Sequence, residues 1–285
     1  MRKERVTPMA NPITKIEHDL LHSTLRVIEK AGGTTAHTDW MRGGKEGENA
    51  SLLIQFINEQ LARAEKNPYE MTVEAQLTAL RRANDEEKWG MTEEDFVRLA
   101  SSAPAWPKGK SAYRSFRIRF GEGDEGVAKT FEAHYARLQH VFGEGRFWRW
   151  NLLHSGKVEY EGTPVERLRL LSGNNTHHAV VEWIVADLDT NRKRESITAV
   201  RDSKSLADEL LVIVWLFKDM IQAIDYDKLP GLFAAGYEVN VPADGDEAWQ
   251  RVVIVLFDRD NRQVRVSAHG RSDGNSYYSV PRLRE

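Results

Sequence analysis

Two aspartates followed by three basic residues form the first candidate site. Asp187 and Asp189 end the strand-like run VVEWIVADLD, and Arg192, Lys193 and Arg194 come shortly after it. Side chains two positions apart on a strand point the same way, about 7 Å apart at the backbone. Two such carboxylates can share a Mg²⁺ or Mn²⁺ ion, since both metals prefer oxygen ligands. The pattern predicts a metal-dependent phosphoester hydrolase or nuclease, and its alternative is a strand that ends in turn-forming residues.

The second candidate is a basic surface with aromatic residues among its cations. Residues 108–119 contain lysines and arginines but no acid, and residues 146–150 read RFWRW. Guanidinium groups fit phosphate oxygens, and exposed rings stack on bases. We expect a solvated sheet face that binds a nucleic acid or another phosphate-bearing partner, the alternative being arginines paired with acids on neighbouring strands. The expected ligand-binding residues are Arg114, Arg117, Arg119, Phe147, Arg149, Arg192, Lys193 and Arg194.

Three histidines are also candidates. His18 and His22 are four residues apart, so on a helix they share one face and could bind a transition metal. That face lies opposite the apolar stripe of the helix, which favours two solvated side chains instead. His134 lies within the apolar stripe of a helix expected over residues 127–142. We expect a hydrogen-bonded core histidine there, with a catalytic or pocket-lining role as the alternative.

Three glycines between a strand and a helix spell the dinucleotide-binding pattern G-x-G-x-x-G. Gly121, Gly123 and Gly126 are separated by acidic residues, at the place where backbone N–H groups would receive a pyrophosphate. The preceding strand alternates between apolar and polar residues, unlike the near-continuous apolar strands of parallel sheets. The pattern therefore indicates a turn in which Asp124 caps the following helix, and we expect no nucleotide cofactor.

The elements that position these residues divide the chain into two regions. Residues 1–104 are expected to be mostly helical, because their apolar residues repeat at helical spacing between stop signals. The stretch SSAPAWPKGKS, residues 101–111, is rich in proline and small polar residues and marks the expected boundary. An arrangement in which both regions share one core is the alternative. The expected helices are 13–31, 50–66, 72–89 and 92–100.

Residues 105–285 combine strand and helix patterns. Runs such as AYRSFRIRF and RVVIVLFD predict strands, and RDNR at 259–262 predicts a hairpin turn between two of them. Residues 205–225 predict a helix that is apolar nearly all round in its middle and is therefore buried. The predicted fold class is α+β, with a helical N-terminal region followed by a mixed or antiparallel sheet packed with two long helices.

Composition restricts the classes of function. The sequence has no cysteine, which excludes disulfides, thiolate metal sites and a cysteine nucleophile. Its net charge of −3 gives no global attraction to nucleic acids or membranes. No apolar run approaches the roughly 20 residues that span a bilayer. We expect a cytoplasmic protein with no signal sequence and no membrane partner.

Three hypotheses for the function follow. The first is a non-catalytic binding protein that contacts a nucleic acid or another phosphate-bearing partner through the basic, aromatic sheet face. The second is a Mg²⁺- or Mn²⁺-dependent hydrolase or nuclease that uses Asp187 and Asp189. The third is an assembly protein whose helical N-terminal region packs against another protein or a second copy of the chain. Whether the protein is an enzyme stays open at this point.

Overall fold

The computed structural model describes residues 66–154, 156–171, 178–189, 195–226, 229–242, 249–274 and 276–284. The helices are α4 (Val73–Glu87), α5 (Glu93–Ser101), α6 (Gly123–Phe142), α7 (Ile197–Val200), α8 (Asp208–Leu216) and α9 (Lys218–Gln222). The strands are β1 (Ala112–Arg119), β2 (Phe147–Arg149), β3 (Lys157–Tyr160), β4 (Thr163–Glu166), β5 (Leu168–Leu170), β6 (Val180–Asp187), β7 (Gly231–Val239), β8 (Arg251–Asp258), β9 (Gln263–Gly270), β10 (Tyr278–Ser279) and β11 (Arg282–Leu283). Together they form an α+β fold, as predicted.

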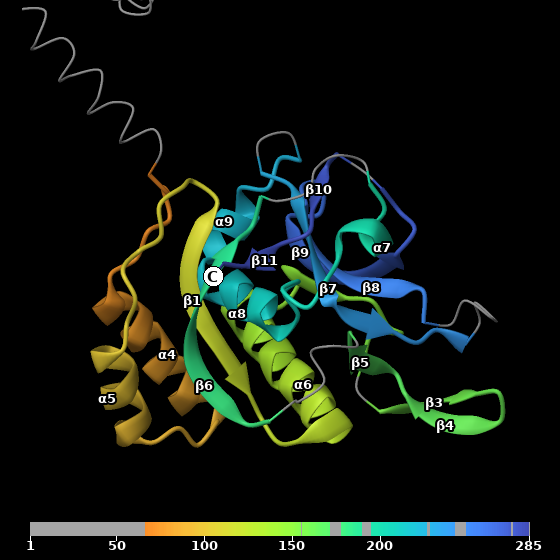
Figure 1. The fold of residues 1–285 in the computed structure, drawn as a ribbon, viewed down its shortest axis with the longest axis horizontal. Coiled ribbons are helices and arrows are strands. Elements are labelled where there is room, and N and C mark those ends of the chain that lie inside the picture. Colours follow the sequence, from red (N-terminus) through yellow and green to blue (C-terminus); the bar gives the residue numbers. More distant parts are fainter. Residues whose placement is uncertain are drawn as a thin grey trace, which may run out of the picture. The chain divides into compact units, whose positions relative to one another are not determined.

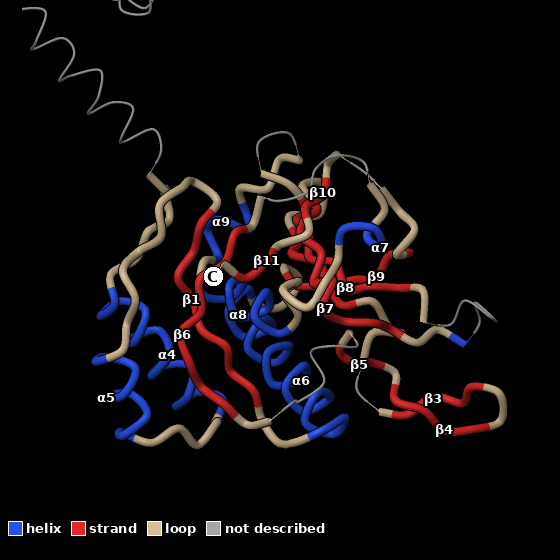
Figure 2. Tube along the Cα trace, viewed as in Figure 1, coloured by secondary structure: helices blue, strands red, loops and turns tan. Residues whose placement is uncertain are grey.

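The first sheet has three strands in the order β1–β6–β11, each antiparallel to its neighbour. Phe116 of β1 lies opposite Trp183 of β6, and their ring centroids are 4.2 Å apart. Helices α4 and α5 lie on one side of this sheet, and α8 packs against the other (Figures 1 and 2). Seven of the eight residues of β1 are buried, so neither of its faces is solvated.

The second sheet has six strands. Its path runs β10–β7–β8–β9–β2, and β5 also pairs with β7. The pairs among β7, β8 and β9 are antiparallel, whereas β2 and β10 join in parallel, so the sheet is mixed. The predicted turn at residues 259–262 is confirmed, since Asp258 of β8 pairs with Gln263 of β9. Strands β3 and β4 form a separate two-stranded hairpin.

Helix α8 lies between the two sheets (Figure 1). Each of its residues is buried, as the apolar pattern predicted. The helix expected over residues 205–225 is interrupted, because the chain leaves helical geometry at Phe217 (φ −113°, ψ 52°) before α9 begins. This break leaves Lys218 and Asp219 exposed at the start of α9.

A close backbone contact fixes the position of the chain just before α8. A Cβ atom on Gly236 of β7 would lie 2.7 Å from the carbonyl oxygen of Ser205 and 2.9 Å from the Cβ of Ala207. The N–H of Gly236 donates to the carbonyl of Leu206 at 2.9 Å. Only glycine leaves room for this approach. The contact therefore holds the N-terminal end of α8 against β7.

The glycine-rich turn joins β1 to α6. Gly121 (φ +78°) and Gly123 (φ +57°) take left-handed conformations, and a Cβ on Gly121 would lie 3.3 Å from the Cα of Gly126. The helix begins at Gly123 with Glu122 as its N-cap, so the expectation that Asp124 caps the helix is wrong. Asp124 lies instead in the first turn, where the helix dipole favours a carboxylate.

The described residues all belong to one compact unit, which comprises residues 65–285. Helices α4 and α5 thus belong to the same unit as both sheets. Within this unit one large hydrophobic core surrounds α8, and a smaller one lies between the second sheet and α7. None of the described helices is long and apolar enough to cross a bilayer.

Candidate functional site

Arg114 of the predicted basic face is buried and used within the fold. Its guanidinium lies between the rings of Trp106 and Trp183, at 5.5 and 5.2 Å from their centroids. Its N–H groups donate to the side chain of Gln76 and to two backbone carbonyl oxygens. These contacts tie β1 to α4 and to the loops beside it, and they leave no cationic surface at this position.

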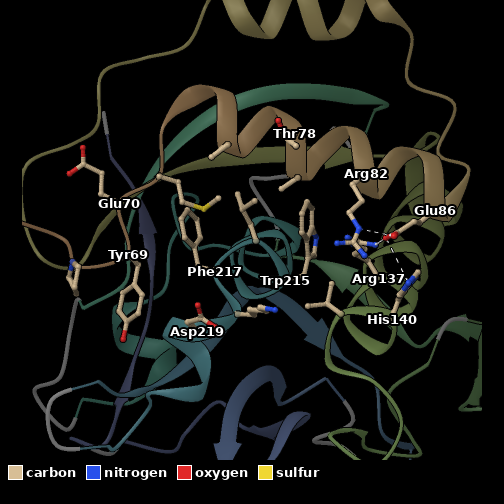
Figure 3. A pocket seen from close by; sticks show the side chains of 17 residues that line it. Tyr69, Glu70, Thr78, Arg82, Glu86, Arg137, His140, Trp215, Phe217 and Asp219 are labelled. Carbon is tan, nitrogen blue, oxygen red and sulfur yellow. Dashed lines mark hydrogen bonds and ion pairs between the residues drawn. The ribbon is translucent and has the colours of Figure 1, made fainter.

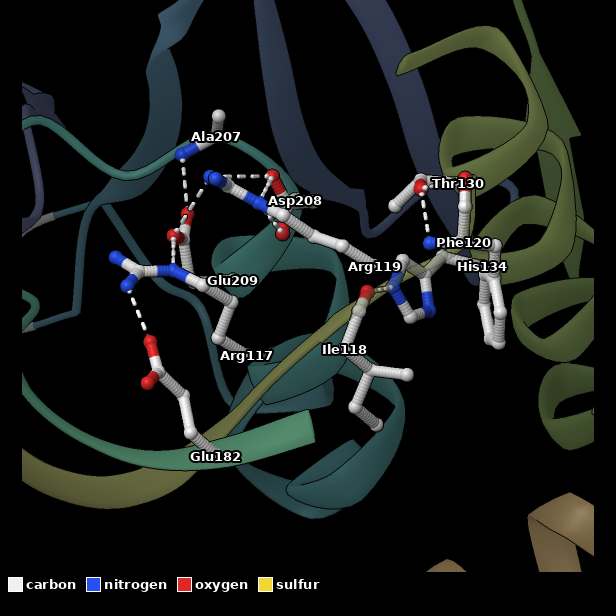
Figure 4. A network of polar contacts seen from close by, with 10 residues as sticks. All are labelled: Arg117, Ile118, Arg119, Phe120, Thr130, His134, Glu182, Ala207, Asp208 and Glu209. Carbon is white, nitrogen blue, oxygen red and sulfur yellow. Dashed lines mark hydrogen bonds and ion pairs between the residues drawn. The ribbon is translucent and has the colours of Figure 1, made fainter. Parts of the chain in front are cut away.

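A cluster of ion pairs lies between β1 and the start of α8. We call it the β1 arginine network, and its members are Arg117, Arg119, Glu182, Asp208 and Glu209 (Figure 4). Arg117 donates to Glu209 at 2.6 Å and to Glu182 at 2.5 Å. Arg119 donates to both oxygens of Asp208 at 3.1 Å and to Glu209 at 3.2 Å. The expectation of a solvated basic face is therefore wrong, because α8 covers these arginines with its own carboxylates.

The network contains more carboxylates than arginines, and its pKa values reflect this. Burial, together with the neighbouring charge of Glu209, raises the pKa of Asp208 to about 7. Burial alone would also raise the pKa of Glu209, but Arg117 and Arg119 outweigh it, and this pKa lies below its usual value. The buried hydroxyl of Tyr237 lies in the same field and keeps its proton, since burial and the two acids raise its pKa. A proton on Asp208 can therefore restore the charge balance of the network.

Phe147 and Arg149 belong to β2 of the second sheet and do not share a face with the β1 arginine network. Arg149 donates to Glu132 of α6 at 2.8 Å, and its guanidinium carbon lies 3.8 Å from the ring centroid of Tyr135. Phe147 packs against rings of the same helix. The common outer face expected for these residues is therefore wrong. The neighbouring ring of Trp148 is the exposed one, at 37%.

Asp187 ends β6 with its carboxylate engaged in several hydrogen bonds. One oxygen accepts from the hydroxyl of Ser111 at 2.5 Å and from the N–H of Asp189 at 3.2 Å, and the other accepts from Arg284 at 2.6 Å. Burial would raise the pKa of Asp187, but the bonds from Arg284 and Ser111 outweigh it and lower the pKa. The bond to the N–H two residues ahead is that of an Asx turn. Among the described residues, no three metal-binding side chains come together.

Five of the predicted site residues lie outside the described ranges. They are His18, His22, Arg192, Lys193 and Arg194. Their expected roles in metal and phosphate binding stay predictions.

His134 donates to the outer edge of β1 (Figure 4). Its Nε2 lies 2.8 Å from the carbonyl oxygen of Ile118, and a carbonyl can only accept, so Nε2 carries the proton. The ring is fully buried, and burial lowers the pKa of His134 to about 4. Two side-chain amides cap the same edge: Asn67 donates to Ala112 at 2.8 Å and Gln76 to Arg114 at 2.7 Å. His134 is thus a neutral core histidine that shields a sheet edge from further pairing.

A pocket of about 670 Å³ lies beside α4, where α6 and α8 end (Figure 3). We call it the α4 pocket. The rings of Trp215 and Phe217 form part of its apolar lining. Ala75 and Ala79, four residues apart on one face of α4, also line the pocket. Its volume falls within the range of pockets that hold small ligands.

The charged groups at one end of the α4 pocket pair with each other. Glu86 accepts from Arg82 at 2.8 Å and also from Arg137. These bonds, first that of Arg137 and then that of Arg82, lower the pKa of Glu86 to about 2. His140 lies 3.1 Å from Glu87. The charges that line the whole pocket balance, with three basic and three acidic residues: Arg82, Arg137, Lys218, Glu70, Glu86 and Asp219.

No motif in the sequence marks the residues of the α4 pocket. Trp215 and Phe217 read as core residues of a buried helix, because they end an apolar run. The charged pair Lys218 and Asp219 follows that run directly, and it is the signal that the helix leaves the core there. Which helix faces those rings depends on tertiary packing, which the helical periodicity of α4 does not specify.

Comparisons of this chain with protein-family models, curated protein sequences and solved structures found no match. Its function is therefore inferred from the contacts, burial and charges of its own residues.

Proposed function

We propose that this protein is a non-catalytic binding protein whose α4 pocket takes an uncharged small molecule with a flat, apolar body. One observation carries the proposal: Tyr69, Trp215 and Phe217 line a pocket of about 670 Å³ whose charged residues balance in number. Pockets of this size with an apolar lining and a few polar groups are the common form of small-molecule sites.

The chemistry of the lining favours an uncharged ligand. Trp215 and Phe217 are themselves nearly buried, so the gain comes mainly from the apolar surface of the ligand, at about 25 cal/mol per Å² removed from water. At the Glu86 end of the pocket, a charged ligand would have to compete for Arg137 or Glu86, which already form an ion pair with each other. Breaking such a partly buried pair leaves one charge without a partner.

The contacts in the lining also favour binding over catalysis. The imidazole of His140 pairs with Glu86 and Glu87 rather than with a hydroxyl group. A hydroxyl nucleophile needs a base within hydrogen-bonding distance for activation. The pocket therefore offers shape and apolar surface, with polar groups around its rim.

The test is a titration with N-phenyl-1-naphthylamine, an uncharged aromatic probe that fluoresces when it leaves water. The blocking variant is Ala75→Trp, since Ala75 is exposed and lines the pocket, so that the larger ring fills it without disturbing the core. The matched control is Val97→Trp on α5, where the side chain is 60% exposed. Both variants add the same ring to a helix surface.

We expect saturable binding of the probe by the wild type and by Val97→Trp. In Ala75→Trp the dissociation constant should rise about tenfold or more, which corresponds to roughly 1.4 kcal/mol. Absence of saturable binding by the wild type, or equal binding by the two variants, would show that the α4 pocket is not the site.

A further inference from the structure

Three arginines from separate elements converge on one buried carboxylate in the second sheet. Glu238 lies on β7, and Arg169 lies directly opposite it on β5. Arg201 follows the last residue of α7, and Arg271 follows the last residue of β9. We call these four residues the Glu238 cluster.

The two oxygens of Glu238 are shared among all three guanidinium groups. One oxygen accepts from Nε and Nη2 of Arg169 at 2.8 and 2.6 Å. The other accepts from Arg201 at 2.6 Å and from Arg271 at 3.4 Å. Arg271 also donates to the side chain of Gln250. The acceptor positions of the carboxylate are thus filled. Each guanidinium has five N–H donors, and some of them are not used by Glu238.

The cluster carries two more positive than negative charges, since three arginines face one glutamate. The acids next in sequence do not correct this. Asp202, beside Arg201, pairs with Arg282, and Asp273, near Arg271, lies 3.8 Å from Nδ1 of His269. In the described part of the chain, neither acid forms an ion pair with an arginine of the cluster. Burial would raise the pKa of Glu238, but the arginine contacts outweigh it and lower the pKa, so the carboxylate stays ionised.

Burial changes across the cluster from the interior to the surface. The side chains of Glu238 and Arg201 are 5% and 8% exposed, and Nη1 of Arg201 is buried with no hydrogen-bond partner in the described part of the chain. Arg169 and Arg271 are 46% and 26% exposed. Arg169 also lies over the ring of Trp249, with its guanidinium carbon 4.0 Å from the ring centroid. Two oriented arginines therefore meet solvent in front of a buried cation.

Excess arginine cannot lose its charge by giving up a proton. A carboxylate in excess can take up a proton, but a guanidinium group keeps its charge at every pH that a folded protein meets. Like charges brought together at a partly buried site destabilise it unless an anion compensates them. We propose that the Glu238 cluster binds a phosphate group, whose oxygens accept from Arg169 and Arg271.

Phosphate matches the cluster in both charge and geometry. A phosphomonoester carries about −1.5 to −2 charges at neutral pH, close to the excess of the cluster. Planar guanidinium groups donate two parallel hydrogen bonds to phosphate oxygens. A phosphodiester carries a single charge for each phosphate, so the monoester is the better match. This site lies on other residues than those expected to form the basic face, and it is separate from the α4 pocket.

The test is isothermal titration calorimetry of the full chain with inorganic phosphate, against sodium chloride at equal ionic strength. The variants are Arg169→Gln and Arg271→Gln, both at partly exposed positions, so that folding is preserved. The matched control is Arg265→Gln on β9, where the arginine is 33% exposed and pairs with Asp258 outside the cluster. Arg201 is left intact, because its burial links its removal to folding.

We expect the wild type and Arg265→Gln to bind phosphate with the same dissociation constant. Each of the two cluster variants should bind about tenfold more weakly, the loss that follows from removing charge-assisted hydrogen bonds. Lack of saturable binding by the wild type would overturn the proposal. Equal affinities of Arg271→Gln, Arg169→Gln and Arg265→Gln would overturn it as well.

A second arm of the titration distinguishes the sources of the phosphate group. It replaces inorganic phosphate with adenosine 5′-monophosphate and with a single-stranded oligonucleotide that lacks terminal phosphates. Equal affinity for inorganic phosphate and adenosine 5′-monophosphate identifies free phosphate as the ligand. Tighter binding of adenosine 5′-monophosphate identifies a phosphomonoester. If the oligonucleotide binds while inorganic phosphate and adenosine 5′-monophosphate do not, the result would contradict the proposed charge match.

Discussion

The β1 arginine network and the Glu238 cluster are built from the same kinds of side chain with opposite charge balance. In the network two arginines meet three carboxylates, and in the cluster three arginines meet one. The network lies between β1 and α8, with both α8 carboxylates buried. The cluster lies where β5, β7 and the ends of α7 and β9 meet, and two of its arginines reach solvent.

The difference shows how each site can become neutral. Burial raises the pKa of Asp208 to about 7, so the network can take up a proton within itself. In the cluster the pKa of Glu238 is lowered, and the arginines cannot give up their charge. Among the described residues no further carboxylate pairs with the cluster, so an anion from solution would supply the missing charge. The same residue type is thus structural at one site and open to a ligand at the other.

Removal of one arginine from each site should give the largest contrast. In Arg119→Ala, the buried carboxylates of Asp208 and Glu209 lose a partner that is itself 8% exposed. We expect the free energy of unfolding to fall by about 3–5 kcal/mol, as when a buried ion pair is broken. Arg271→Ala removes an excess cation from a partly exposed position, and in phosphate-free buffer we expect a change within about 0.5 kcal/mol.

Urea denaturation of both variants in phosphate-free buffer measures this contrast. Similar losses of stability in Arg119→Ala and Arg271→Ala would mean that the arginines of the cluster are as structural as those of the network. The comparison would then fail, whatever the affinity for phosphate.

A smaller effect is expected from neutralising the carboxylate of the cluster. Glu238→Gln keeps the size of the side chain but leaves three guanidinium groups without an anion, and we expect a loss of about 2 kcal/mol, as for hydrogen bonds to charged groups. Inorganic phosphate should restore part of this loss, because it supplies the missing charge. The control is Glu182→Gln, at a position in the network where the side chain is 43% exposed. We expect this variant to lose less than about 1 kcal/mol of its free energy of unfolding. Phosphate should stabilise it no more than it stabilises the wild type. Equal responses of both variants to phosphate would place its effect outside the cluster.

Local patterns in the sequence predicted much of the fold. The alternation in AYRSFRIRF predicted the strand β1, the residues RDNR at 259–262 predicted the turn of the β8–β9 hairpin, and the apolar run within residues 205–225 predicted a buried helix. Each of these follows from periodicity or turn chemistry within a few residues. The same patterns failed at the break after Leu216, where an interruption of one residue divides one expected helix into two.

The sites could not be predicted in the same way, because their partners are far apart in sequence. Alternation assigned Arg117 and Arg119 to one face of β1, but it could not reveal that the carboxylates of α8, about ninety residues later, cover that face. The Glu238 cluster draws its four members from β5, β7 and the chain just after α7 and after β9. No two of its arginines are close enough in sequence to form a motif, so only the tertiary fold brings them together.

The smallest expected effect is the pH dependence of the network. The folded pKa of Asp208, about 7, lies above the usual value of 3.8, so the folded protein holds an extra proton between these pH values. The stability that this proton contributes is present below about pH 4 and is lost as the pH rises to 7. Asp208→Asn has no such proton to lose, so its free energy of unfolding should rise relative to that of the wild type over this interval. Buried, neutral His134 makes both proteins less stable in acid and cancels in the difference. Urea denaturation of both proteins from pH 4 to 8 measures this difference in the free energy of unfolding. If the two pH profiles run parallel, Asp208 stays ionised and Arg119 alone balances its charge.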